Sequence, residues 1–184
     1  MGTIKPPKMV KSFAGLLVSD LSLTADCISL LELTFGPIDL QSQTIPFAHT
    51  DYYHPEMGNQ ISRLWVSFSE LADPENLASW KIRSNQMEET WARECSGTRR
   101  RRVNVDPGYL CDSKVVLATT KDYSHRMYLH SGIYAEVTLS YSRGKGWQPY
   151  SWTYPDYRDR PALNFFALVR NQYRRQVSGQ LRLP

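Results

Sequence analysis

The chain lacks several features that define large protein classes. No apolar stretch approaches the ~20 residues that a membrane-spanning helix needs, and the basic N-terminus lacks the apolar core and cleavage site of a signal peptide. Only three cysteines occur in 184 residues, far apart in the sequence, which does not suit a disulfide framework. These absences predict a globular protein of the reducing cytoplasm with no membrane partner.

Several catalytic signatures are also missing. The sequence has no GxxxxGK[ST] phosphate loop, no HExxH, no GxSxG and no closely spaced cysteine pair. A structural zinc site and nucleophilic catalysis are therefore not supported. The sequence leaves open whether the protein is an enzyme.

The charge is distributed unevenly along a chain of ordinary globular composition, with 41% hydrophobic and 22% charged residues. Residues 1–98 carry 7 Lys/Arg against 12 Asp/Glu, and residues 99–184 carry 15 against 6, within a net charge of +4. This asymmetry predicts a basic face that attracts phosphate or nucleic acid. The alternative is a single domain that mixes both halves in space.

Hydrophobic periodicity and turn residues predict eleven elements in the order β-α-β-β-α-β-α-β-β-β-α. The expected strands are 13–18, 43–49, 62–69, 102–106, 125–130, 133–141 and 147–153. The expected helices are 24–35, one opened by Asp73-Pro74-Glu75 that ends before Ser96, 115–120 and 161–177. This order predicts an α+β fold, in which about four helices cover a mixed, largely antiparallel sheet.

The domain organisation follows from composition breaks. Residues 1–11 are expected to be a flexible N-terminal arm, and residues 12–184 a single α+β domain. The arginine-rich stretch 96–101 could join two lobes of that domain, 12–95 and 102–178.

Polar residues crowd into five short stretches, four of which fall at or after the end of an expected strand. They are 49–58, 102–109, 119–126, 134–136 and 152–158. Loop ends held by a rigid sheet commonly carry binding groups, so we expect the sheet to bring these stretches into a single pocket.

Two of the expected strands carry a carboxylate on their polar face, Asp106 in one and Glu136 in the other. A buried carboxylate needs a cation, a metal or several hydrogen bonds. If the strands are neighbours, the two carboxylates could face each other across a cleft, with Lys121, Arg126 and Arg158 as the answering cations. The alternative is a solvated sheet face, which alternates in the same way.

These stretches supply candidates for three roles. The expected ligand-binding residues are Lys121, Arg126, Arg158, Asn104, Tyr134 and Tyr157. Carboxylates at Asp51, Glu56, Asp106 and Glu136 would suit Mg²⁺ or Mn²⁺ carrying a phosphate ligand. His125, near Asp122, is the best candidate proton carrier. The alternative is structural: Asp51 caps a turn, and the histidine is simply hydrogen-bonded.

Local patterns give two further candidate sites for anions. The Asp106-Pro107-Gly108 turn precedes the expected helix 115–120, whose N-terminus would favour phosphate unless it is a plain turn capped by Asp112. Arg99–Arg102, together with arginines of the last helix, could track a nucleic-acid backbone. Those helix arginines are Arg170, Arg174 and Arg175.

At these same residues the sequence resembles a prokaryotic family catalogued as domain of unknown function 4416. The matching pieces are FAGLLVSD (13–20), LTFGPID (33–39), TDYYHPEMG (50–58), VNVDPGYL (103–110), LATTKDYSHRMYL (117–129), GIYAEVTL (132–139) and WTYPDYR (152–158). Some members are labelled GTP-binding protein, although this chain has no phosphate loop. The resemblance implies no activity or site roles that can be carried over.

Together these patterns predict a polar cleft that holds a phosphorylated small molecule or nucleotide, extended in one version by a divalent metal and a metal-assisted reaction. The alternative is a nucleic-acid or protein-binding module without catalysis, which uses the Arg-rich C-terminal half.

Overall fold

A nine-stranded antiparallel sheet forms the centre of the protein in the computed structural model, which describes residues 2–95 and 97–180. Its strand order is β11-β10-β8-β7-β1-β4-β2, with β3 paired to β4 and β9 paired to β10. The strands are β1 (Val10–Val18), β2 (Ile38–Gln41), β3 (Ile45–Pro46), β4 (Ser62–Ala72), β7 (Val103–Leu110), β8 (Lys114–Thr119), β9 (Met127–His130), β10 (Ile133–Ser142) and β11 (Gly146–Pro149). The α+β prediction is confirmed, with a fully antiparallel sheet in place of a mixed one.

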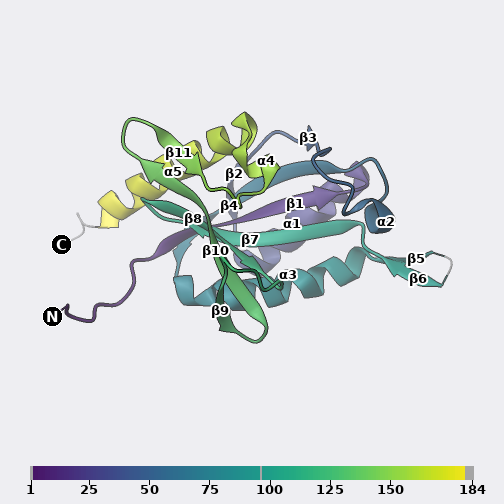
Figure 1. Ribbon diagram of the computed structural model, residues 1–184, viewed down its shortest axis with the longest axis horizontal. Coiled ribbons are helices and arrows are strands. Elements are labelled where there is room, and N and C mark those ends of the chain that lie inside the picture. Colours follow the sequence, from purple (N-terminus) through teal and green to yellow (C-terminus); the bar gives the residue numbers. More distant parts are fainter. Residues whose placement is uncertain (1, 96, 181–184) are drawn as a thin grey trace.

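Helices cover both faces of this sheet (Figure 1). They are α1 (Thr24–Phe35), α2 (His54–Met57), α3 (Leu77–Trp91), α4 (Pro155–Arg158) and α5 (Arg160–Gln180), with short 3-10 turns η1 (Leu21–Leu23) and η2 (Pro74–Asn76). Alternate side chains of β1 point to opposite faces: Phe13 packs in the cluster of α5, and Leu16 packs in the cluster of α1. A separate two-stranded ribbon, β5 (Arg93–Cys95) and β6 (Thr98–Arg100), extends from one end of the molecule.

The long helices match the sequence-based expectation closely. The helix at 24–35 has the expected bounds and ends at Gly36, whose φ of 97° favours glycine. Asp73 caps η2 by accepting a hydrogen bond from the Glu75 amide, and α3 then buries the expected apolar face. The Ser131-Gly132 turn between β9 and β10 is also present, with φ of 53° and 75°.

Several expectations are wrong. The segment at 115–120 is not a helix but the strand β8, because β-branched valines fit between β7 and β10 and are buried there. The strand at 43–49 shrinks to β3, while β2 was not anticipated. The expected arm, 1–11, overlaps β1, which begins at Val10 and buries Lys11 against Asp39.

β7 also does not break at Pro107-Gly108. The main-chain groups of Val105 point away from β1 toward side chains of α3, and those of Pro107, two residues on, point to the same side. β8 pairs with β7 only from Gly108 onward, so proline's missing N–H falls where no strand requires it. Pro107 therefore remains inside the strand.

The sheet is open beside this part of β7. In place of a neighbouring strand, Glu88 accepts a hydrogen bond from the Val105 amide (2.8 Å), and Lys81 donates one to the Val105 carbonyl (2.9 Å). Two charged side chains of α3 thus satisfy the main-chain hydrogen-bonding groups at this edge of β7. This opening positions the cavity described next.

Candidate functional site

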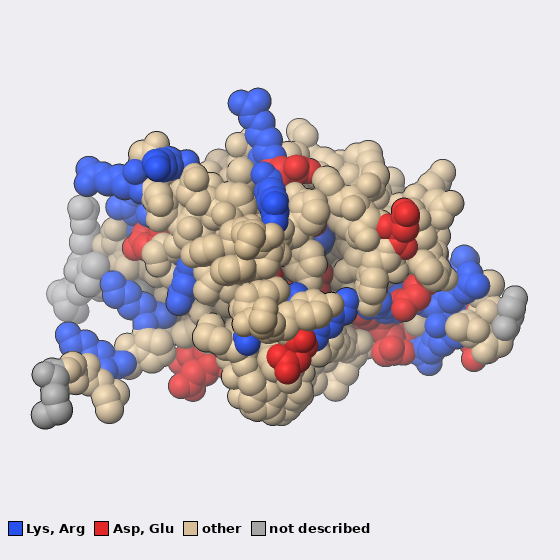
Figure 2. All heavy atoms as spheres, in the orientation of Figure 1, with Lys and Arg blue, Asp and Glu red and all other residues tan. Residues whose placement is uncertain are grey.

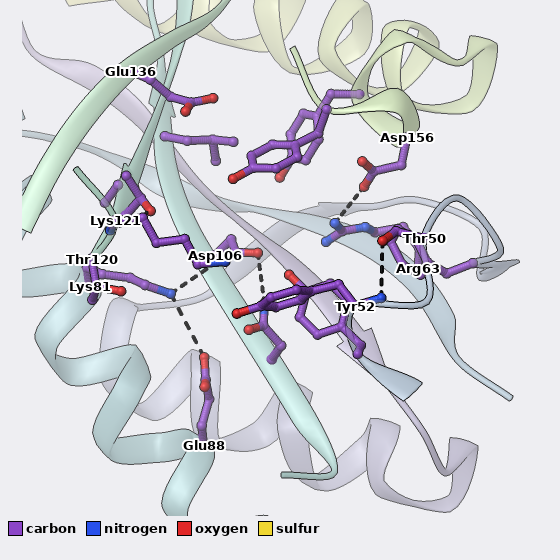
Figure 3. A pocket seen from close by; sticks show the side chains of 18 of the residues that line it. Thr50, Tyr52, Arg63, Lys81, Glu88, Asp106, Thr120, Lys121, Glu136 and Asp156 are labelled. Atoms are coloured by element: carbon purple, nitrogen blue, oxygen red, sulfur yellow. Dashed lines mark hydrogen bonds and ion pairs between the residues drawn. The ribbon is translucent and has the colours of Figure 1, made fainter. Parts of the chain in front are cut away.

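A cavity of about 610 Å³ lies at the opening of the sheet (Figure 3). Each of the five polar stretches identified in the sequence contributes to its wall, together with residues of β4 and α3. The lining residues with polar side chains include Thr50, Tyr53, Arg63, Lys81, Glu88, Asn104, Asp106, Lys121, Glu136, Tyr154, Asp156 and Tyr157. The fold thus gathers segments from widely separated parts of the chain around one space.

One wall contains a buried ion pair. Arg63, on β4, is 4% exposed and pairs with Asp156 at the start of α4, with 2.5 Å between Nη2 and Oδ2. The guanidinium carbon lies 5.3–5.5 Å from the ring centroids of Phe47, Trp65 and Tyr157. A buried arginine is stable only with such a partner and electron-rich surroundings.

Several hydrogen-bond donors around this ion pair remain free. Arg63 Nε and Nη1 have no hydrogen-bond partner among the described residues, and the Tyr157 hydroxyl, which lies within reach of the Trp65 N–H, donates to no described acceptor. Burial raises the pKa of Tyr157 far above its ordinary value, so its hydroxyl stays protonated and can donate. Each unsatisfied buried donor costs about 1–3 kcal/mol. This wall therefore favours a group rich in acceptor oxygens.

Asp106 occupies the middle of the cavity, between Lys81 and Arg63 (Figure 3). Its Oδ1 accepts from Lys81 Nζ (3.1 Å), and its Oδ2 accepts from Asn104 Nδ2 (2.8 Å). Burial alone would raise the pKa of Asp106, but the charges of Lys81 and Arg63 and these hydrogen bonds outweigh it and lower the pKa. Asp106 is therefore ionised and held in place.

The pKa of the neighbouring carboxylate on α3 is shifted in the opposite direction. Glu88 is buried, and this burial raises its pKa despite the nearby charge of Lys81 and the hydrogen bond from Val105. Arg101 Nη1 lies 3.4 Å from Glu88 Oε2 and also donates to Asn104 (3.1 Å). One network thus connects the α3 carboxylate to Asp106.

A second network surrounds Glu136 on β10. Arg126 donates to Glu136 (2.8 Å), to the Tyr154 hydroxyl (2.8 Å) and to the Lys121 carbonyl (3.0 Å), and His125 lies 3.3 Å from the same carboxylate oxygen. Arg126 is not part of the cavity wall, and its donors are used in these contacts. It holds the 119–126 loop against β10 and positions Glu136 and Tyr154.

Lys121 lies at the rim of the cavity. Its Nζ is 4.0 Å from the ring centroid of Tyr52, an exposed side chain that also lines the cavity. No carboxylate of the described residues forms an ion pair with Lys121 at this position. This lysine is thus available to a ligand entering the cavity.

The four carboxylates expected to hold a metal do not come together. Asp51 is 94% exposed and pairs with His54, while Glu56 pairs with Arg101. The other two, Asp106 and Glu136, pair with Lys81 and Arg126. Across residues 2–95 and 97–180, no group of three or more His, Cys, Asp or Glu side chains is placed to hold a metal ion. The expected metal set is therefore corrected to a series of separate ion pairs.

Other predicted residues lie outside the cavity wall. Arg158 donates to the main-chain oxygens of Ser151 and Thr153, and Tyr134 packs edge-on against Tyr128. Asp122 is exposed, and His125 stacks on Trp152 beside the cavity. The anion site expected after Asp106-Pro107-Gly108 is also absent, because these residues lie inside β7 and the strand β8, not a helix, follows.

The arginine run at 99–102 is largely paired. Arg99 contacts Glu89, Arg101 contacts Glu56 and Glu88, and Arg102 contacts Asp20. Figure 2 shows the same mixture, with Lys and Arg interspersed with Asp and Glu over the β5–β6 end. Most of this run's charge is therefore neutralised within the protein.

Two central residues of the site were missed in the sequence. Arg63 directly precedes the apolar run Leu64-Trp65-Val66 in a buried strand, and Lys81 shares a helix face with Leu77 and Ser84. A charge inside a buried pattern requires a partner, and that signal was available in both places.

The fold and the cavity define an antiparallel α+β protein with a polar site at an opening in its sheet. The chain belongs to the family described as Domain of unknown function (DUF4416), whose model matches residues 8–173. No curated protein and no solved structure matches the chain. Within the described part of the chain, no helix has both the length and the apolar character needed to cross a membrane.

Proposed function

We propose that the cavity binds a small phosphorylated compound, with a nucleotide among the candidates, and that Arg63 anchors its anionic group. The observation that carries this proposal is the set of buried donors without an acceptor on Arg63 and Tyr157. Arg63 and Tyr157 also line the cavity. A guanidinium in a dry aromatic surrounding binds phosphate oxygens strongly, because the low dielectric strengthens charge-assisted hydrogen bonds.

The cavity has the size and surface that such a ligand requires. Small-molecule pockets measure about 300–1,000 Å³ and combine apolar walls with a few placed polar groups, and 610 Å³ falls in this range. The aromatic side chains of the wall supply the apolar surface: Phe47, Tyr52, Tyr53, Tyr123, Tyr154 and Tyr157. Lys121 adds an accessible positive charge at the rim.

A divalent metal enters this proposal only as an ion carried by the phosphate, because the described carboxylates near the cavity are each paired with a cation. Mg²⁺ and Mn²⁺ are the candidates, since both bind phosphate oxygens. The nucleic-acid alternative has no comparable observation in its favour, because most of the 99–102 arginine run is paired.

A thermal-shift screen tests the proposal with nucleoside phosphates and sugar phosphates, each beside its unphosphorylated counterpart, with and without Mg²⁺. A ligand at 100 times its Kd adds about 2.7 kcal/mol to the free energy of unfolding. For a chain of this size that corresponds to a Tm increase of roughly 5–10 °C. If no phosphorylated compound raises the Tm, or if the unphosphorylated counterparts raise it equally, the proposal is wrong.

A further inference from the structure

The carboxylates of the cavity differ in how far a ligand can reach them. Side chains of Glu136, Asp156 and Glu88 are 1%, 4% and 6% exposed, whereas Asp106 is 27% exposed. The rim residue Glu89 is more exposed but pairs with an arginine outside the cavity wall. Asp106 is therefore the interior carboxylate most open to a bound molecule.

Asp106 is held rigidly for such a contact. A chain of hydrogen bonds runs from Glu56 through Arg101 and Asn104 to its Oδ2, and Lys81 fixes Oδ1 from the other side. Lys81 is itself fixed by its bond to the Val105 carbonyl. A preorganised acceptor of this kind binds ligand groups with little loss of entropy.

The charge of Asp106 is already balanced, which decides the type of ligand group it accepts. Lys81 Nζ lies 3.1 Å from Oδ1, and Arg63 is close enough to lower the carboxyl pKa. A second cation beside Asp106, whether an ammonium or a metal ion, would be repelled by these two charges. A neutral donor, that is a hydroxyl, brings no such repulsion and still uses the remaining lone pairs of the carboxylate.

From this arrangement we infer that the phosphorylated ligand carries a sugar, whose hydroxyls donate to Asp106 while its phosphate binds at Arg63. The inference rests on the proposed function and adds the substrate class to it. The tyrosine rings of the wall, Tyr52 and Tyr53 among them, provide apolar surface for the C–H faces of a sugar ring. Asn104, whose amide already donates to Asp106, has a second N–H for a sugar oxygen.

Calorimetric titration with three probes tests this inference: ribose 5-phosphate, tetrahydrofurfuryl phosphate, which has the same ring and phosphate without ring hydroxyls, and inorganic phosphate. In the unaltered protein we expect ribose 5-phosphate to bind at least tenfold more tightly than the analogue without hydroxyls. This comparison needs no variant. Equal affinities for the two ring compounds would overturn the inference.

A pair of variants then assigns the preference to the carboxylate. Asp106→Asn should remove most of the difference between the two ring compounds, with inorganic phosphate affected less than about threefold. Asp112→Asn removes an equivalent charge from a residue outside the cavity wall and should preserve the difference. If Asp106→Asn weakens all probes equally, the inference fails while the proposed function stands. If none of the three probes binds the unaltered protein, the inference fails, and the proposed function is decided by the thermal-shift screen.

Discussion

Gly15 lies directly against the hydroxyl of Tyr157: a Cβ placed on Gly15 would be 2.6 Å from that oxygen and 3.0 Å from Arg63 Nη1. The backbone of β1 at Gly15 thus packs directly against the Tyr157 hydroxyl and Arg63 Nη1. A Cβ at this position would displace the Tyr157 hydroxyl and crowd the guanidinium of Arg63.

Replacing this glycine should therefore disturb both the fold and the site. Gly15→Ala forces the hydroxyl and the guanidinium to move within a packed layer, and we expect it to lower the free energy of unfolding by about 1–3 kcal/mol. Gly179→Ala is the matched control, because its Cβ meets open space in α5 and should stabilise the helix by about 0.5–1 kcal/mol. Urea unfolding measures both changes, and similar effects of the two substitutions would contradict the role assigned to Gly15.

The second prediction concerns ligand affinity. Arg63→Lys retains a positive charge for Asp156 but loses the fork of N–H donors, so the affinity for the phosphorylated ligand found in the screen should fall at least tenfold, or about 1.4 kcal/mol. Arg158→Lys makes the same exchange at an arginine that bonds only to the main chain outside the cavity wall. The affinity of the Arg158→Lys variant for the same ligand should be unchanged. Equal losses in both variants would show that Arg63 does not anchor the ligand.

The third prediction is that Asp106 and Glu88 contribute to the free energy of unfolding with opposite dependence on pH. The pKa of Asp106 is below its ordinary value of 3.8, so its contribution to stability is present above that pH and is lost as pH falls through the lower folded value. The pKa of Glu88 is above its ordinary value of 4.5, so its contribution is present below that pH and is lost as pH rises through the raised folded value.

These signs can be measured as differences in unfolding free energy across the acid range. The advantage of the unaltered protein over Asp106→Asn should shrink toward low pH, whereas its advantage over Glu88→Gln should shrink toward neutral pH. Each variant serves as the other's control. Difference curves with the same slope for both would refute the assignment.

The fourth prediction separates a positioning arginine from a surface arginine. The Arg126 side chain is 2% exposed, and its removal leaves the buried carboxylate of Glu136 without its closest cation, so Arg126→Ala should cost about 3–5 kcal/mol. Arg158→Ala loses only hydrogen bonds to carbonyls and should cost about 0.5–1.5 kcal/mol. Hydrogen exchange should show the 119–126 loop less protected in the first variant alone. Unaltered exchange in Arg126→Ala would mean that this arginine does not hold the loop.

The sequence pattern predicted the elements that are specified by a few neighbouring residues. The cap formed by Asp73, the apolar face of α3 and the glycine after α1 each depend on a short stretch of sequence, and the structure contains all three as expected. The Ser131-Gly132 turn is another such case. The 115–120 segment failed because its strand state depends on pairing with β7 and β10, which lie outside the segment itself.

The same division applies to the site. The sequence by itself determined that polar residues crowd into five stretches, and that Asp106 and Glu136 stand on the polar faces of their strands. It could not assign a partner to any charge, because ion pairs such as Arg63 with Asp156 join residues almost a hundred positions apart. Only the tertiary structure decided which charges neutralise one another, which donors remain free, and where the sheet opens. Those outcomes depend on strand pairing and burial across the whole chain, and no short window of sequence contains them.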